Sequence, residues 1–488
     1  MTETPVQPPA AESAAQLVTR KFLTLGAGEM VARLIGFAAT IFIARQLGAD
    51  AYGIVGFGFA VSLYLATAAD AGLEQHGPQE VASAEVPLGT LISSVLIGRI
   101  LLAIVLALGL GAASLFAPRP DSIVLALYGL TLLPAGANAR WAHYGLHNSA
   151  AVARARIAAE LLRVTLVFAL VHEPADALYV PLAQFAGDSL AALFLIRQLA
   201  RNGIHVEARL DMRILRAVLR RASPLLANNM LALAIYNADV IFLRFFRTVV
   251  EVGQYLAAYT LINFLGVLGN LTTVTLVPNL ARMGSVVANG SLLEPGSAGE
   301  RTDLVHSMLA RVFVAGLPIA VGGSLLAVRL IDFVFGPDYA PAGPVLALLI
   351  WTIPILLARG VYTAVLIAQA RHDAVLRSTA AAAALNVALN CLAVPILGMI
   401  GAAMTTLLAE AVRMIISRSY MPHSGIAPAP ARRFIRTAVA TLVMAATLAF
   451  GPPLPLFLAV AAGIVIYFAS MFAIGGLRWE HGHPALRV

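Results

Sequence analysis

The stretch "TAVATLVMAATLAFGPPLPLFLAVAAGIVIYFASMFAIGGL", residues 437–477, contains no charged side chain. Its central "GPPLP" divides it into two apolar segments of about 20 residues each, the length that crosses the hydrocarbon core of a bilayer. The whole chain follows this pattern: its 488 residues are 60% hydrophobic and 12% charged, and its mean hydropathy is +0.85. Soluble domains are about one quarter charged, so the composition predicts an integral membrane protein.

Apolar windows recur along the chain and predict an all-α, polytopic membrane protein with about 14 transmembrane helices. The expected spans are 22–44, 52–75, 88–115, 121–140, 151–171, 177–197, 222–243, 253–278, 307–334, 343–367, 375–396, 399–418, 434–451 and 453–476. An even number of spans places both termini on the same side of the membrane. The first 19 residues are polar and rich in proline, so we expect a disordered tail over 1–19 rather than a signal peptide.

The basic residues indicate on which side of the membrane the termini lie. The loops on the side of the termini carry Lys21 and 21 arginines, whereas the alternate loops carry only Arg45, Arg119, Arg244 and Arg247. The positive-inside rule therefore predicts cytoplasmic termini, and we expect the protein to lie in the cell inner membrane. The net charge of +8 is spread over short loops between apolar segments, which is typical of topology signals and not of a nucleic-acid-binding face.

An internal repeat underlies this pattern. With an offset of 200 residues, "RKFLTLGAGEMVARLIGFAATIFIARQLGADAYG" (20–53) aligns with "RRASPLLANNMLALAIYNADVIFLRFFRTVVEVG" (220–253), so that Gly53 matches Gly253. The offset corresponds to six spans and predicts two pseudo-symmetric lobes with a transport site at their interface. The expected parts are an N-lobe (20–200, spans 1–6), a cytoplasmic linker (201–221), a C-lobe (222–420, spans 7–12), and an appended pair of spans with a short tail (421–488).

Several stretches also resemble a known family. They are "IARQLGADAYGIVGFGFAVSLYLATAADAGLEQHGPQEVA" (43–82), "EVGQYLAAYTLINFL" (251–265), "VPNLARM" (277–283), "FGPDYAPAGPVLALL" (335–349) and "LNVALNCLAVPILGMIGAAMTTLLAEAVR" (385–413). They are similar to polysaccharide and O-antigen flippases, the oligosaccharidyl-lipid branch of the MOP exporter superfamily, which also contains MATE exporters and lipid II flippases. The resemblance covers about residues 20–420. It implies a V-shaped transporter that moves polyprenyl-pyrophosphate-linked glycans to the outer leaflet.

Ionisable residues inside the spans are the candidate site, because a charge near the bilayer centre costs about 2.5–3.5 kcal/mol on insertion scales. Three pairs have helical i, i+3 or i, i+4 spacing and neutralise one another or line a cavity: Glu29–Arg33, Glu160–Arg163 and Glu410–Arg413. Others have no opposite charge at that spacing and need a partner on another helix or a wet cavity: Arg99, Asp188, Asp239 and Arg359.

A pyrophosphate headgroup favours arginine because the guanidinium offers bidentate donors. We therefore expect a cleft between the lobes lined by Glu29, Arg33, Arg99, Arg163, Asn237, Asp239 and Arg359. Arg244, near the end of its span, is expected to reach the outer surface. Asp70, Glu74 and Asp188 are candidates for H⁺ or Na⁺ coupling, since Asp70 and Glu74 repel each other unless a proton or an arginine is near. No metal or organic cofactor is predicted.

Three functions remain open. The first is a flippase for lipid-linked oligosaccharide, with the bilayer and a polysaccharide polymerase or export complex as partners. The second is a MATE-like, ion-coupled exporter of small organic cations, which would need an acidic cavity. The third is a membrane glycan polymerase or ligase, which would need larger external loops than the expected ones of about ten residues. The chain has no G-x-x-x-x-G-K-[ST] loop for ATP hydrolysis.

Overall fold

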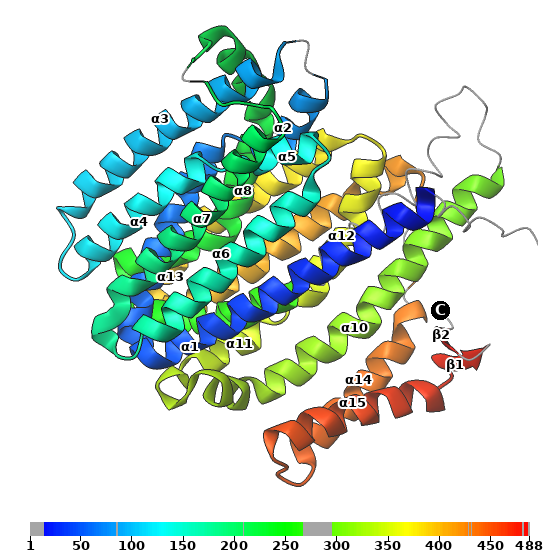
Figure 1. Cartoon of the computed structure of the whole chain (residues 1–488). Helices are drawn as coiled ribbons and strands as arrows, with labels where there is room; N and C mark the ends of the chain where they lie inside the picture. The colour runs from blue at the N-terminus through cyan, green and yellow to red at the C-terminus, as the bar shows by residue number, and fades with distance from the viewer. Residues whose placement is uncertain are drawn as a thin grey trace, which may run out of the picture.

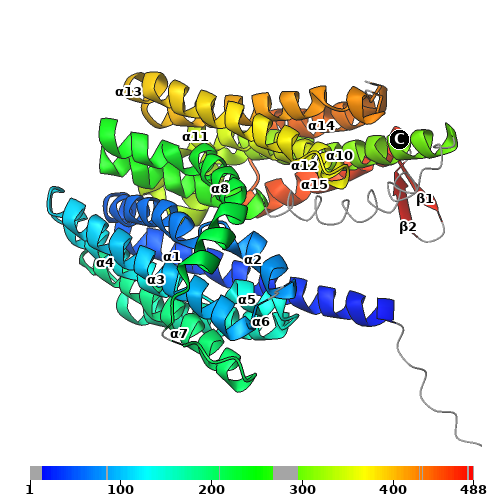
Figure 2. The ribbon, with the colours of Figure 1, turned by 90° about the horizontal axis from the view of Figure 1, so that it is seen from above.

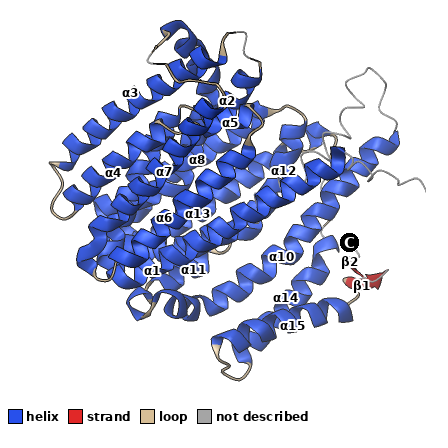
Figure 3. Cartoon of the chain, in the orientation of Figure 1, coloured by secondary structure: helices blue, strands red, loops and turns tan. Residues whose placement is uncertain are grey.

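A computed structural model of the chain describes residues 14–83, 86–207, 209–266, 295–427, 429–430, 432–480 and 483–486, with side chains from Leu34 onward in the first helix. The described part is almost entirely helical (Figure 3), which confirms the all-α prediction. A short antiparallel hairpin near the C-terminus, β1 (Leu477–Glu480) and β2 (His483–Leu486), was not predicted from the apolar windows.

The first part of the chain forms seven α-helices and one short 3₁₀ helix. They are α1 (Ala14–Asp70), α2 (Leu73–Ala82), α3 (Leu88–Ser114), α4 (Asp121–Gly136), α5 (Arg140–Gly145), α6 (Ser149–Leu170), η1 (Pro174–Leu178) and α7 (Tyr179–Arg201). Within this part α1 packs on α4 and α6, α3 packs on α4, and α6 packs on α7. These contacts form the N-lobe.

The second part begins with a 35-residue helix, α8 (Met212–Phe246), followed by helical residues 249–266. It continues with α10 (Pro295–Phe335), η2 (Pro337–Tyr339), α11 (Ala342–Leu349), α12 (Thr352–Ala368), α13 (His372–Ser419) and η3 (Pro422–Ser424). The last helices, α14 (Arg432–Phe450) and α15 (Leu456–Ala473), pack on each other and on α10. Figure 1 shows this pair at the edge of the bundle, as expected for appended spans.

Ten helices in the described ranges are long and apolar enough to cross a membrane. This confirms a multi-pass membrane protein, while the count of 14 spans stays a prediction. The ranges of α1 and α13 each cover two expected spans, and the helical conformation breaks between them at Gly48 (φ 69°) and at Gly398 (φ 56°), so that each range holds two helical segments. The expected span 253–278 lies partly outside the described residues. The expected span 151–171 is helix α6, which is not among those ten because it carries four charged residues, Arg154, Arg156, Glu160 and Arg163, so that this span stays a prediction.

The two lobes lie side by side. Seen from above in Figure 2, α1 to α7 occupy one side, and α10 to α15 occupy the other. Helix α8 lies where the lobes meet and contacts α13 of the C-lobe as well as α1, α2 and α3. Its first turns pack Val218 and Ala222 into the buried core of the N-lobe, whereas Ile235 packs in one cluster with Ala382 of the C-lobe. Residues 212–221, expected to be part of the linker, are the start of this helix.

The lobes touch at both ends of the bundle. We call the end that carries α2, α5 and residues 202–211 the linker end, and the end that carries η1 and η2 the far end. At the far end the hydroxyl of Tyr339 donates to the carbonyl of Ala44 over 2.6 Å, and the backbones of Gly53 and Gly253 approach closely. At the linker end Nε2 of Gln75 on α2 donates to Oδ1 of Asn229, in the later turns of α8, over 3.3 Å.

Candidate functional site: an interlobe track

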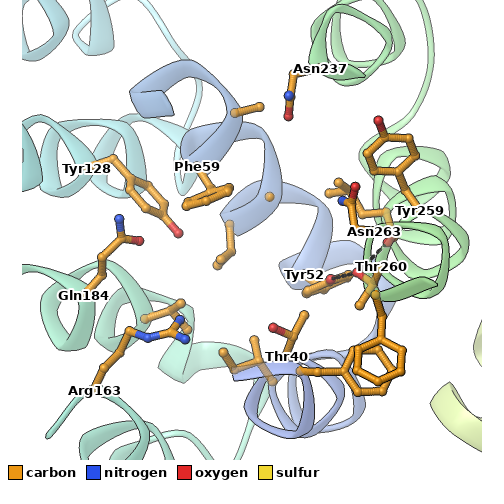
Figure 4. A pocket seen from close by; sticks show the side chains of 18 residues that line it. Thr40, Tyr52, Phe59, Tyr128, Arg163, Gln184, Asn237, Tyr259, Thr260 and Asn263 are labelled. Atoms are coloured by element: carbon orange, nitrogen blue, oxygen red, sulfur yellow. Dashed lines mark hydrogen bonds between the residues drawn. The ribbon is translucent and has the colours of Figure 1, made fainter. Parts of the chain in front are cut away.

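A cavity of about 330 Å³ lies between the lobes, nearer the far end. It is bounded by α1, α4, α6 and α7 of the N-lobe, and by α8 and helical residues 249–266 of the C-lobe. Figure 4 shows its labelled side chains, which surround a common space: Thr40, Tyr52, Phe59, Tyr128, Arg163, Gln184, Asn237, Tyr259, Thr260 and Asn263. The other lining residues are mostly apolar. We call this the far-end cavity.

The lining of the far-end cavity is polar but almost uncharged. Apart from Arg163, the labelled side chains are amides, hydroxyls and aromatic rings, and Arg163 is the one charged side chain among the described residues that line the cavity. Arg163 donates from Nε to Glu160 over 3.2 Å, so the predicted i, i+3 pair forms with its arginine at the cavity. Such a lining offers hydrogen bonds and flat apolar faces to a neutral polar ligand.

A second cavity, of about 520 Å³, lies between the lobes nearer the linker end. Five charged side chains line it, namely Asp70, Glu74, Arg99, Arg140 and Asp188, together with neutral polar groups that include Gln75, Asn138 and Asn229. We call this the linker-end cavity. Of the residues predicted for the site, it brings together Arg99 and all three coupling candidates.

The two cavities follow one another along the same helices. On α7, Gln184 lines the far-end cavity, and Asp188, one turn later, lines the linker-end cavity; their side chains are hydrogen-bonded. On α8, Asn237 lines the far-end cavity and the adjacent Tyr236 lines the linker-end cavity. We call the two successive cavities together the track; among the described lining residues, Arg163 is the one charged side chain toward the far end, and five charged side chains lie toward the linker end.

Arg99 is held almost completely by the N-lobe. It is 5% exposed and donates to the backbone carbonyls of Ala69, Ala135 and Asn138 over 3.3, 3.1 and 2.9 Å. Its Nη2 lies 3.2 Å from Oδ1 of Asp70. Each guanidinium nitrogen therefore already has a protein acceptor, and Arg99 mainly joins the ends of α1 and α4 where they meet α3.

The expected repulsion between Asp70 and Glu74 is relieved by two arginines, one for each carboxylate. Asp70 pairs with Arg99, and Glu74 pairs with Arg140, whose Nη2 lies 3.0 Å from Oε2 of Glu74. Asp188 differs, because among the described residues its side-chain hydrogen bond is to the neutral Gln184 and it forms no ion pair. Asp188 is thus the unpaired carboxylate of the track.

Asp239 lies away from the cavity in which we expected it. Its side chain is 0% exposed inside the C-lobe, and its carboxylate accepts hydrogen bonds from Tyr255, Asn390 and Thr406. Its neighbour Asn237 does line the far-end cavity, because the two residues point to different faces of α8. Its neighbours on α13, Asn390 and Thr406, lie 151 and 167 residues away in the chain, so the local pattern of α8 does not predict them.

Arg359 also lies within the C-lobe. Its Nε donates to Oε2 of Glu410 over 3.0 Å and its Nη2 to the hydroxyl of Tyr236 over 3.2 Å. Glu410 is 0% exposed and is shared with Arg413, 3.5 Å away. Neither described cavity is lined by Arg359, in contrast to the expectation from the sequence. Arg244, expected at the outer surface, instead pairs with Asp121 of α4 over 2.9 Å. The side chains of Glu29 and Arg33 lie outside the described residues.

Sequence reasoning missed several residues of the track. Tyr52, Tyr128 and Tyr259 lie in apolar segments where an aromatic ring predicts only packing, and Gln184 carries no charge to single it out. Arg140 was counted only as a loop arginine that marks topology. A search for polar side chains at the spacing of one helix face would have found Gln184 together with Asp188.

Comparisons with known proteins agree with this architecture. The chain is similar to a solved lipid II flippase, MurJ, in an inward closed conformation, with 13% identity over 93% of this chain and 98% of that chain, and a TM-score of 0.75. The chain is also similar to an inward-facing multidrug resistance transporter of the MATE family, with 14% identity over 80% of this chain and 95% of that chain, and a TM-score of 0.55.

A MOP superfamily transporter from Pyrococcus furiosus, reported to have a binding pocket of reverse polarity, gives 14% identity, 84% and 97% coverage, and a TM-score of 0.55. At such identities these likenesses show the fold, a MurJ- and MATE-like helical bundle. No curated protein matches the chain. The family model described as "Polysaccharide biosynthesis protein" matches residues 18–284, more than half of the 488 residues. The chain therefore belongs to the polysaccharide biosynthesis protein family.

Proposed function

We propose that the protein is a flippase that moves polyprenyl-pyrophosphate-linked oligosaccharide from the cytoplasmic to the outer leaflet of the inner membrane by alternating access. Its product would supply a surface polysaccharide such as an O-antigen or exopolysaccharide, assembled by a polymerase or export complex. The family and the fold support a transporter. The observation that carries the glycan assignment is the far-end cavity, where Arg163 is the one charged side chain among the described lining residues and the others offer amides, hydroxyls and rings.

A glycan needs this kind of lining because each hydroxyl that leaves water must find a new hydrogen-bond partner. Gln184, Asn237 and Asn263 each offer both donors and an acceptor, and Tyr128 and Tyr259 add ring faces. An organic cation would instead gain most from a carboxylate in the cavity, and the charged residue there is an arginine. The polyprenyl tail stays in the bilayer and needs no cavity.

A MATE-like exporter of organic cations is the second candidate. The observation in its favour is the linker-end cavity, where three carboxylates face two arginines. Asp188 in particular has no ion-pair partner in the described part of the chain. The two candidates make opposite demands on the far-end cavity, so one experiment can separate them.

The test is transport by the purified protein in liposomes. A fluorescent lipid-linked oligosaccharide and a fluorescent organic cation are offered separately, and a membrane-impermeant quencher reports the outer leaflet. We expect the oligosaccharide alone to move, and Gln184→Ala, Asn237→Ala and Asn263→Ala each to slow it by up to about tenfold, the worth of one hydrogen bond. Asn202→Ala, exposed at the end of α7, is the matched control. Transport of the cation alone would overturn the proposal.

Topology is part of the proposal. The excess of basic residues in one set of loops supports cytoplasmic termini, which makes the linker end the cytoplasmic end of the track. Single cysteines at Asn202 and at Glu173, in a Cys391→Ser background, test it with an impermeant thiol reagent on intact cells. We expect labelling at position 173, which lies between α6 and α7 at the far end, and protection at position 202. The reverse pattern would invert the topology.

A further inference from the structure

We infer that Arg140 is the anion-binding group of the linker-end cavity, and that Glu74 occupies its guanidinium until a phosphate or pyrophosphate displaces the carboxylate. The inference rests on the proposed function, because it locates the part of the track that receives the charged headgroup of the substrate.

The other arginine of this cavity is not free for a ligand. Arg99 is 5% exposed, and its nitrogens already donate to three backbone carbonyls and to Asp70. A ligand would have to break several hydrogen bonds inside the N-lobe to reach it, and each buried group left without a partner costs about 1–3 kcal/mol. Arg99 therefore supports the wall of the cavity and does not bind the anion.

Arg140 has the opposite character. One ion pair holds it, from Nη2 to Oε2 of Glu74 over 3.0 Å, and the two side chains are 36% and 37% exposed. Its Nε is buried and has no hydrogen-bond partner among the residues that the structure describes. A buried donor without an acceptor is unusual in a folded protein, and here it belongs to a side chain that lines a cavity of about 520 Å³.

Neutral donors surround the same space. The amide groups of Gln75 on α2, Asn138 after α4 and Asn229 on α8 all line the cavity. Gln75 donates to Oδ1 of Asn229 over 3.3 Å, so the two lobes meet at this point. A tetrahedral anion bound to Nε and Nη2 of Arg140 would find these amides as further donors, and the fork of the guanidinium suits phosphate oxygens.

Glu74 therefore competes with the anion for the guanidinium of Arg140. Glu74 holds Nη2, one of the two donors that a bidentate phosphate would use, so the carboxylate and the phosphate cannot occupy Arg140 together. Removing the charge of Glu74 should strengthen binding of the anion, whereas removing Arg140 should weaken it. A pair with a purely structural role would behave differently, because loss of either partner would damage the cavity in the same direction.

The experiment measures binding of inorganic pyrophosphate to the purified full-length protein by calorimetry. We expect Arg140→Gln to weaken binding by about tenfold or more and Glu74→Gln to tighten it by about threefold to tenfold. The exposed pair Asp373–Arg377, 3.9 Å apart on α13, supplies matched controls: Asp373→Asn and Arg377→Gln should leave binding unchanged. Unfolding temperature confirms that each variant is folded. Weaker binding in both Arg140→Gln and Glu74→Gln, or unchanged binding in Arg140→Gln, overturns the inference.

A second arm uses a polyprenyl pyrophosphate without sugar, presented in lipid nanodiscs. The same opposite shifts with both probes support a site for the lipid headgroup, and the same shifts with the inorganic probe alone support a site for a free anion. The liposome assay separates this inference from the proposed function. If the two variants shift pyrophosphate binding in opposite directions but the protein transports no glycan, only the proposed function is contradicted. If the protein transports glycan but Arg140→Gln binds pyrophosphate as the wild type does, only this inference is contradicted.

Discussion

Gly53 of α1 and Gly253 of the C-lobe lie in backbone contact where the lobes meet at the far end. A Cβ added at Gly53 would overlap the carbonyl of Val249 and lie 3.0 Å from the nitrogen of Gly253, and one added at Gly253 would overlap the carbonyl of Ala49. These two positions match each other in the 200-residue repeat, and each meets the same part of the other lobe. Such reciprocal contact is the mark of a two-fold relation, so the pseudo-symmetry axis passes close to this pair.

Substitution of either glycine should loosen this contact. We expect Gly53→Ala and Gly253→Ala each to lower the free energy of unfolding by about 1–3 kcal/mol, because backbone cannot move aside as the end of a side chain can. Thermal unfolding of the purified protein measures the effect. Gly109→Ala on α3, where nothing lies within 4 Å of an added Cβ, is the control and should be neutral. Equal stability of all three variants would contradict the close approach.

Arg359→Ala should destabilise the C-lobe. It removes the main partner of Glu410, a carboxylate that is 0% exposed, and breaking a buried ion pair from one side costs about 3–5 kcal/mol. The double variant Arg359→Leu, Glu410→Leu should recover part of this loss, since no unpaired carboxylate remains. Thermal unfolding compares the two. If Arg359→Ala keeps its stability and yet transports nothing, Arg359 has a role in transport and not only in stability.

The hydrogen bond between Gln75 and Asn229 should hold the linker end closed. It joins α2 of the N-lobe to the part of α8 that follows Pro224, with Nε2 of Gln75 3.3 Å from Oδ1 of Asn229. In a Cys391→Ser background, cysteines at both positions joined by a short reducible cross-linker should stop transport in liposomes, and reduction should restore it. The single cysteines carrying the same reagent are controls. Unimpaired transport by the cross-linked protein would show that the lobes stay together here during the cycle.

Asp188 should connect transport to an ion gradient. Its carboxylate lies in the track with the neutral Gln184 as its hydrogen-bond partner, so a proton or Na⁺ can neutralise it without displacing an arginine. We expect Asp188→Asn to transport at a rate that no longer responds to an imposed proton or sodium gradient, while wild-type transport rises several-fold. Glu160→Gln, already paired with Arg163, is the comparison. An unchanged response in Asp188→Asn would remove it from the coupling step.

Much of the architecture follows from patterns that are local in the sequence. The uncharged stretch 437–477 indicates spans, and the repeat with Gly53 on Gly253 indicates two lobes, since both depend on the order of residues along the chain. The partners of buried charges depend on contacts between distant helices. Arg99 meets Asp70 and Arg359 meets Glu410 across 29 and 51 residues, and neither spacing follows from helical periodicity. For this reason the sequence identifies the ionisable residues but does not show which of them line the track and which are buried within a lobe.

Helix α8 belongs to both lobes, with its first turns in the core of one and its later turns in the core of the other. If the lobes swing apart at the linker end, the boundary between the moving bodies must cross this helix and not the loop before it. Pro224 lies just past the N-lobe section and leaves the carbonyl one turn earlier without its usual amide. The helix can bend there at little cost, so residues 212–222 would travel with the helices that precede them in the chain.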